Sequence, residues 1–168
     1  MKKFMILIFS MALMASCGDN EKENLSREFD DLMTENDSIE SVATEFENIH
    51  QEMLQTHNEL KQQLEGAQLE DSTLLESMAE HEAILKNHEA MRAGHKKMME
   101  GHKELKQNFG QLSSDEMKAQ ITKMREHHDE MMSDHETMRS DHEKMRDEHD
   151  EIRKNLIDSN RENQPTGS

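Results

Sequence analysis

Apolar side chains recur every three, four or seven residues along three long stretches of the chain, which is the spacing of amphipathic helices. Short glycine-containing segments, near Gly66 and near Gly110, separate the stretches. The third stretch keeps to a period of seven, which favours left-handed supercoiling. The apolar face of the first stretch is the most conventional and consists of Leu25, Phe29, Leu32, Ile39, Val42, Phe46, Ile49, Met53, Leu60 and Leu64.

Helix-start signals follow both glycines. Thr73 with Glu76, and Ser113 with Glu116, have the spacing of a capping box, in which two side chains satisfy free backbone N–H groups of a first helical turn. Helices of similar length joined by short connections favour an all-α fold, a long antiparallel three-helix bundle or coiled coil. We predict helices over about residues 24–65, 73–108 and 114–158, forming one bundle over 25–158 before a disordered tail over 159–168.

Composition excludes most other folds. Charged residues make up 34% of the chain, which has one proline, six glycines and neither tryptophan nor tyrosine. β-branched and aromatic residues are too few for a sheet, whereas the abundant Glu, Lys, Gln, Met and Leu favour helix. The formal charge of −17 would repel a phosphate backbone, so we do not expect nucleic acid as a partner.

The N-terminus has the layout of a secretory signal rather than of a membrane-spanning helix, because Lys2 and Lys3 precede a short apolar run from Phe4 to Leu13. The run ends in a motif that resembles the lipobox of bacterial lipoproteins, Leu13-Met14-Ala15-Ser16-Cys17. The resemblance implies that a signal peptide over residues 1–16 is cleaved and that Cys17 is lipidated. The lipid would anchor the chain in a membrane of the cell envelope.

Residues 17–24 form an acidic segment that we expect to be a solvated tether. It is similar to the acidic signal of some Bacteroidota lipoproteins at the cell surface. Gly18 rather than aspartate follows Cys17, unlike the inner-membrane retention signal of enterobacterial lipoproteins, so we expect the outer membrane, on its periplasmic face or at the cell surface. The chain also has a general resemblance to short flavobacterial lipoproteins labelled viral A-type inclusion protein, which implies no biochemical activity.

The helices carry histidine at one repeating position. Of the 11 histidines, all but His127 lie on three ladders with a step of seven residues: His50 and His57; His81, His88, His95 and His102; and His128, His135, His142 and His149. An apolar residue, usually methionine, follows three residues after most of them. This pattern is expected either for a packed coiled-coil interior or for a series of metal ligands.

Helix geometry limits the metal chemistry. Successive ladder histidines are about 10.5 Å apart along a helix, so one ladder cannot chelate a single ion, and a zinc site would need a second helix. Methionines three or four residues from a histidine share its helical face, and a set of imidazole and thioether favours Cu(I) or Ag(I). Similar spacings occur in periplasmic copper- and silver-handling proteins. The candidate ligands are His88, Met91, His95, Met98, His102, His128, Met131, His135, Met138, His142 and Met145.

Acidic residues beside the ladders, such as Asp134 and Glu136, are expected on neighbouring faces and are poor candidates for ligands. No nucleophile, HExxH motif, phosphate loop or paired-carboxylate pocket can be recognised, so we do not expect an enzyme. The sequence favours a non-enzymatic spacer or protein-interaction module that is attached to the membrane by a lipid on Cys17. It does not identify the protein partner, and self-association remains an open alternative. The alternative is sequestration of Cu(I) or Ag(I).

Overall fold

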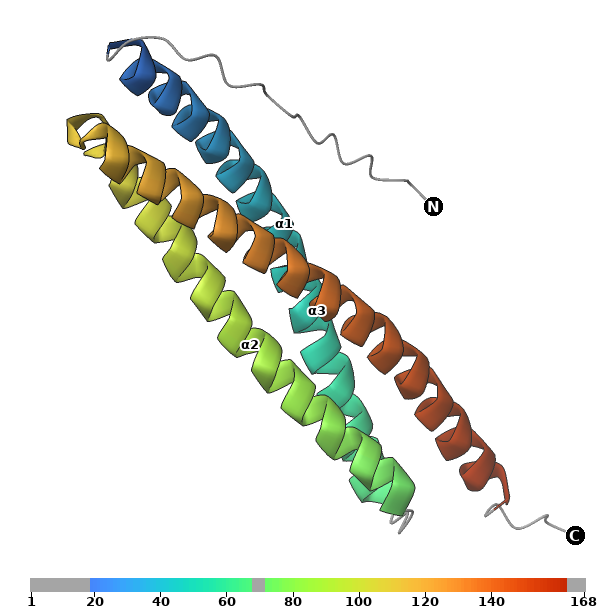
Figure 1. Cartoon of the computed structure of the whole chain (residues 1–168). Helices are drawn as coiled ribbons and strands as arrows, with labels where there is room; N and C mark the ends of the chain where they lie inside the picture. Colours follow the sequence, from blue (N-terminus) through green and yellow to red (C-terminus); the bar gives the residue numbers. More distant parts are fainter. Residues whose placement is uncertain (1–18, 68–71, 163–168) are drawn as a thin grey trace, which may run out of the picture.

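The computed structural model describes residues 19–67 and 72–162, which fold as an all-α bundle, as predicted. In this part of the chain the helices are α1 (Asp19–Ala67), α2 (Ser72–Lys106), the short 3-10 helix η1 (Phe109–Gln111) and α3 (Ser114–Glu162). α1 and α3 run in the same direction and α2 runs back against both, so the molecule is a long rod (Figure 1). The 49 residues of α1 correspond to a length of about 73 Å.

Two boundaries differ from the prediction. α1 begins at Asp19, so most of the predicted tether over residues 17–24 is helical. Contacts with the start of α3 explain the extension: Glu21 pairs with Lys118 at 2.6 Å, and Lys22 Nζ donates to the carbonyl oxygen of Leu112 at 2.8 Å. α3 continues to Glu162, into the predicted disordered tail. The predicted signal peptide and Cys17 lie outside the described residues.

The connection between α2 and α3 closes one end of the rod. The predicted capping box is confirmed there, since the backbone N–H of Ser113 donates to Glu116 Oε2 at 2.8 Å and the Glu116 N–H donates to Ser113 Oγ at 3.4 Å. Phe109 of η1 is buried and stacks on Phe29 of α1, with ring centroids 3.9 Å apart. The connection therefore fixes the register of α3 against the other two helices.

The interior alternates between apolar levels and histidine levels. One apolar level consists of Ile39, Met99 and Met131, and another consists of Met53, Leu85 and Met145. The apolar cluster at the far end of the rod consists of Leu60, Leu64, Met78, Ile152 and Leu156. All ten ladder histidines are at most 5% exposed. Histidine is thus a regular component of the core, where every polar atom needs a partner. Neither residues 19–67 nor 72–162 contain a helical stretch apolar and long enough to cross a bilayer.

Candidate metal centre

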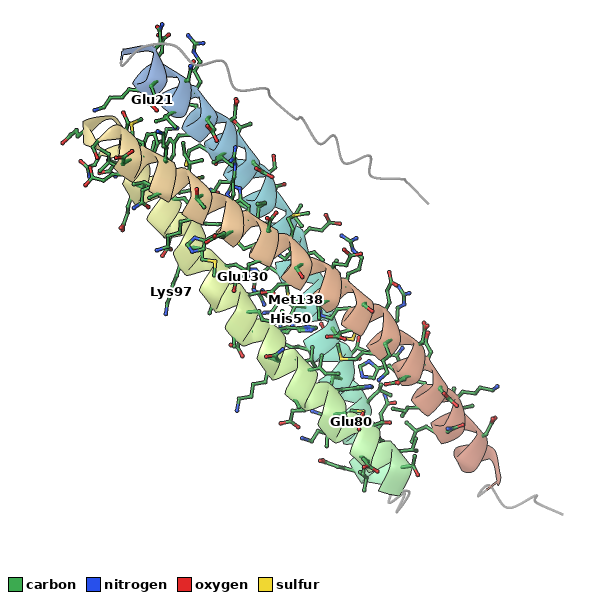
Figure 2. The ribbon with its side chains drawn as sticks, in the orientation of Figure 1. Glu21, His50, Glu80, Lys97, Glu130 and Met138 are labelled. Carbon is green, nitrogen blue, oxygen red and sulfur yellow. The ribbon has the colours of Figure 1, made fainter. Side chains whose placement is uncertain are left out.

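Three histidines from three different helices meet near the middle of the rod. We call His50 of α1, His88 of α2 and His142 of α3 the central triad; one ring nitrogen from each lies within 4.8 Å of the other two. His50 lies between the helices at mid-length, whereas the exposed Lys97 lies toward the outside (Figure 2). The triad forms because the ladder of α2, running backwards, stays level with the ladders of α1 and α3 at every seventh residue.

A second set of three lies one heptad further along. We call His57, His81 and His149 the distal triad, and their ring nitrogens also lie within 4.8 Å of one another. His81 Nδ1 is 3.1 Å from His149 Nε2, and the matching distance in the central triad, from His88 Nδ1 to His142 Nε2, is 3.3 Å. Nitrogens bound to one zinc ion at about 2.0–2.1 Å are about 3.0–3.5 Å apart in a tetrahedral site. Two of the three ligands in each triad are therefore already at coordination spacing.

Carboxylates fix the orientation of the α2 histidines. Nε2 of His88 donates to Asp141 at 2.9 Å, and Nε2 of His81 donates to Glu148 at 2.5 Å. Because an ionised carboxylate only accepts, the proton of each neutral ring is on Nε2, and the lone pair of Nδ1 faces the centre of the triad. Protein zinc sites commonly hold their histidines by such a hydrogen bond from the ring nitrogen that is not bound to the metal.

These acidic residues have a role that the sequence did not predict. Asp134, expected on a neighbouring face, accepts a hydrogen bond from His95 Nε2 at 2.8 Å, as Asp141 and Glu148 do for the next two histidines of α2. Each is the residue directly before a ladder histidine of α3, and each is about one-third exposed. They lie at the edge of the α2–α3 interface and act on the ligands without being ligands themselves.

Burial disfavours the charged form of four of the six triad histidines. Burial, together with the neighbouring histidines, lowers the pKa of both His142 and His149 to about 4. Burial also lowers the pKa of His50 and His57, to which His88 and His81 contribute next. At these four positions the unfolded chain takes up protons near pH 6.5 but the folded chain does not, so their contribution to stability is complete above about pH 6.5 and falls as the pH drops toward 4. At neutral pH each of the four rings therefore keeps one nitrogen free of a proton.

Many buried polar atoms have no hydrogen-bond partner among the described residues. Leaving a buried polar atom unsatisfied costs about 1–3 kcal/mol, so a core that accumulates them has low stability without a ligand. The unpartnered atoms are Nδ2 of Asn36, Nδ1 of His50, His95, His142 and His149, and both ring nitrogens of His57, His128 and His135. Nδ1 of His128 lies 3.3 Å from a carboxylate oxygen of Glu35 but without the geometry of a hydrogen bond.

Two further levels have histidine on α2 and α3 but not on α1. His95 and His135 meet edge to face, with ring centroids 5.1 Å apart, and Ala43 is the α1 residue one heptad before His50. The last level contains His102 and His128, with Asn36 in the α1 position. Within residues 19–67 and 72–162, the central and distal levels are the ones that supply three nitrogens close enough together for a single ion.

The predicted ligand set overlaps the triads only at His88 and His142. Two of its methionines lie in apolar levels. Met131 packs with Ile39 and Met99. Met145 packs with Met53 and Leu85. Met138 is also fully buried, whereas Met91 and Met98 are partly buried. The pairing of histidine with methionine around a metal ion stays a prediction. Sequence reasoning missed four triad members, His50, His57, His81 and His149. Stepping outward by seven along both ladders from the pair nearest the connection, His102 and His128, would have paired the ladders of α2 and α3.

Searches of protein-family models, of curated proteins and of solved structures find no match to this chain.

Proposed function

We propose that this chain is a lipid-anchored protein of the cell envelope that binds divalent transition-metal ions in the central and distal triads. The observation that supports the proposal most strongly is the convergence of three buried imidazoles in each triad, with the α2 histidine oriented by a carboxylate. Three histidine nitrogens with a fourth position for water are a frequent ligand set for Zn²⁺, and imidazole also suits Cu²⁺, Co²⁺ and Ni²⁺.

Binding needs only small movements. In each triad the α2 and α3 nitrogens are at coordination spacing, and the α1 histidine has to approach by on the order of 1–2 Å to join them. The α3 histidine can turn its Nε2 lone pair to the ion by moving its proton to Nδ1, so no proton has to leave the protein. The two ions would lie about 10.5 Å apart along the rod, far enough for independent sites.

Titration of a soluble form, residues 18–168, with Zn²⁺ tests the proposal. Two ions should bind tightly, and replacing Met131, Met138 and Met145 by leucine should leave Zn²⁺ affinity unchanged.

Because the pKa values of His142 and His149 are lowered to about 4, binding should persist at pH 6, where exposed histidines already lose metal to protons. Affinity that falls between pH 7 and pH 6 as for a surface histidine cluster would contradict the proposal. In a parallel titration with Cu(I), loss of affinity in the leucine variant would favour the histidine–methionine alternative.

The membrane anchor is the second part of the proposal and is supported by the lipobox resemblance of residues 13–17. Replacing Cys17 by serine should move the protein from the membrane fraction to the soluble fraction, because the lipid is attached through the cysteine sulfur. Cell fractionation and the mass of the mature chain measure this. Full retention in the membrane fraction, with an unprocessed mass for the wild type, would contradict lipidation.

The rod shape supports a second proposal, that the chain acts as a spacer. Each 49-residue helix is about 73 Å long, enough to carry a binding region well away from a membrane surface. This role is compatible with metal binding, since ions that connect all three helices would stiffen the rod.

A further inference from the structure

The histidine level nearest the α2–α3 connection departs from the rule that the other three follow. At those three levels, the residue before the α3 ladder histidine is acidic and accepts a hydrogen bond from Nε2 of the α2 histidine. At this level the same position is His127, the one histidine outside the ladders. Nδ1 of His127 lies 3.0 Å from Nε2 of His102, and the two rings stack with centroids 5.2 Å apart.

Asn36 reverses the orientation of His102. The Asn36 side-chain oxygen lies 2.9 Å from Nδ1 of His102, and because an amide oxygen only accepts, Nδ1 is the donor. The lone pair of His102 is then on Nε2, which faces His127. In the triads the α2 histidine presents Nδ1 to the interior; here it presents Nε2 to the edge of the bundle.

We propose that His102 and His127 form a third metal site, an accessible two-histidine site for a divalent transition-metal ion, separate from the triads. The 3.0 Å between Nε2 of His102 and Nδ1 of His127 fits two neighbouring ligands at about 2.0–2.1 Å from one ion. His102 is buried, whereas His127 is only partly buried. An ion can therefore reach the pair from solvent and keep water in its remaining positions.

The charges nearby set the strength of this site. Lys123 is close enough to His102 to act on it electrostatically. The positive charge of Lys123 opposes a bound cation, and only two histidines point at the ion. The site should therefore bind less tightly than the triads and exchange its ion faster.

The test uses Cu²⁺ as the probe and the full chain in detergent. A variant with His142→Leu and His149→Leu removes one ligand from each triad, so the two-histidine site should be the one that remains. This variant should still bind one ion, and nuclear magnetic resonance signals near His102 and His127 should broaden first. Adding His127→Gln should weaken that binding at least tenfold.

A matched control is Glu126→Gln, which changes an exposed neighbour without removing a nitrogen ligand and should leave affinity within twofold. Because the double leucine variant alters the core, the same comparison is made in the wild-type background, where His127→Gln should remove one of the bound ions and leave the triads loaded. Equal Cu²⁺ affinity with and without His127, or broadening that starts elsewhere, would overturn the third site. A wild-type chain that binds only the His127-dependent ion and none at the triads would instead overturn the proposed function.

Discussion

Replacing His57 by leucine is expected to stabilise the metal-free bundle and to weaken binding in the distal triad. Both ring nitrogens of His57 are buried without a partner among the described residues, and the side chain is 3% exposed. Removing such atoms should raise the free energy of unfolding by about 1–3 kcal/mol. Thermal or urea unfolding followed by circular dichroism, without metal, measures the gain.

The same variant should lose part of the stabilisation that metal gives. An ion at one hundred times its dissociation constant stabilises a folded protein by about 2.7 kcal/mol per site, so the wild type should gain this amount at each triad and the His57 variant should gain less at the distal triad. Met53→Leu, a volume-conserving change in the neighbouring apolar level, is the control and should show neither effect. A His57 variant that is less stable than the wild type without metal, or that keeps the full response to metal, would contradict this account.

Replacing Ala43 by histidine should create a new three-histidine site. Ala43 is one heptad before His50 and level with His95 and His135, and Asp134 already orients His95. Nδ1 of His95 and both ring nitrogens of His135 have no partner among the described residues, so they are free to bind. A cavity of about 450 Å³, lined by Ala43 and His95 among others, gives room for the added imidazole.

The Ala43→His variant should therefore bind one more Zn²⁺ ion per chain than the wild type, and saturating metal should stabilise it by about a further 2.7 kcal/mol at one hundred times the dissociation constant. Isothermal titration gives the stoichiometry. Ala43→Leu fills the same space without a nitrogen and should bind the wild-type number of ions. If the histidine and leucine variants bind equal numbers, the assignment of residues to levels is wrong.

What the sequence predicted well was local. The helix-favouring composition, the glycine-containing breaks and the Ser113–Glu116 capping box depend on neighbouring residues, and the fold class followed from them. The triads depend on something else, the alignment of three helices that are distant in sequence. That alignment is set by packing such as the stack of Phe109 on Phe29, which no periodicity along one helix contains.

The role of the α3 carboxylates could not be predicted from the sequence for the same reason. On a single helix, Asp141 is beside the apolar seam and looks like part of a solvated face. In the bundle, α2 covers that edge and brings His88 within hydrogen-bonding distance of it. Arg92 is a related case, because its position repeats with Leu85 and Met99 of the core and yet it is charged; it pairs with Glu47 of α1. Residues at the edge of a seam thus take their role from the neighbouring helix.

The most direct test of metal binding by the triads is X-ray absorption at the zinc edge. The His127→Gln variant, loaded with two Zn²⁺ ions per chain, restricts the signal to the central and distal triads. We expect about three imidazole nitrogens and one further oxygen or nitrogen at about 2.0–2.1 Å. Sulfur at about 2.3 Å, or a shell without the multiple scattering of imidazole rings, would contradict the three-histidine sites.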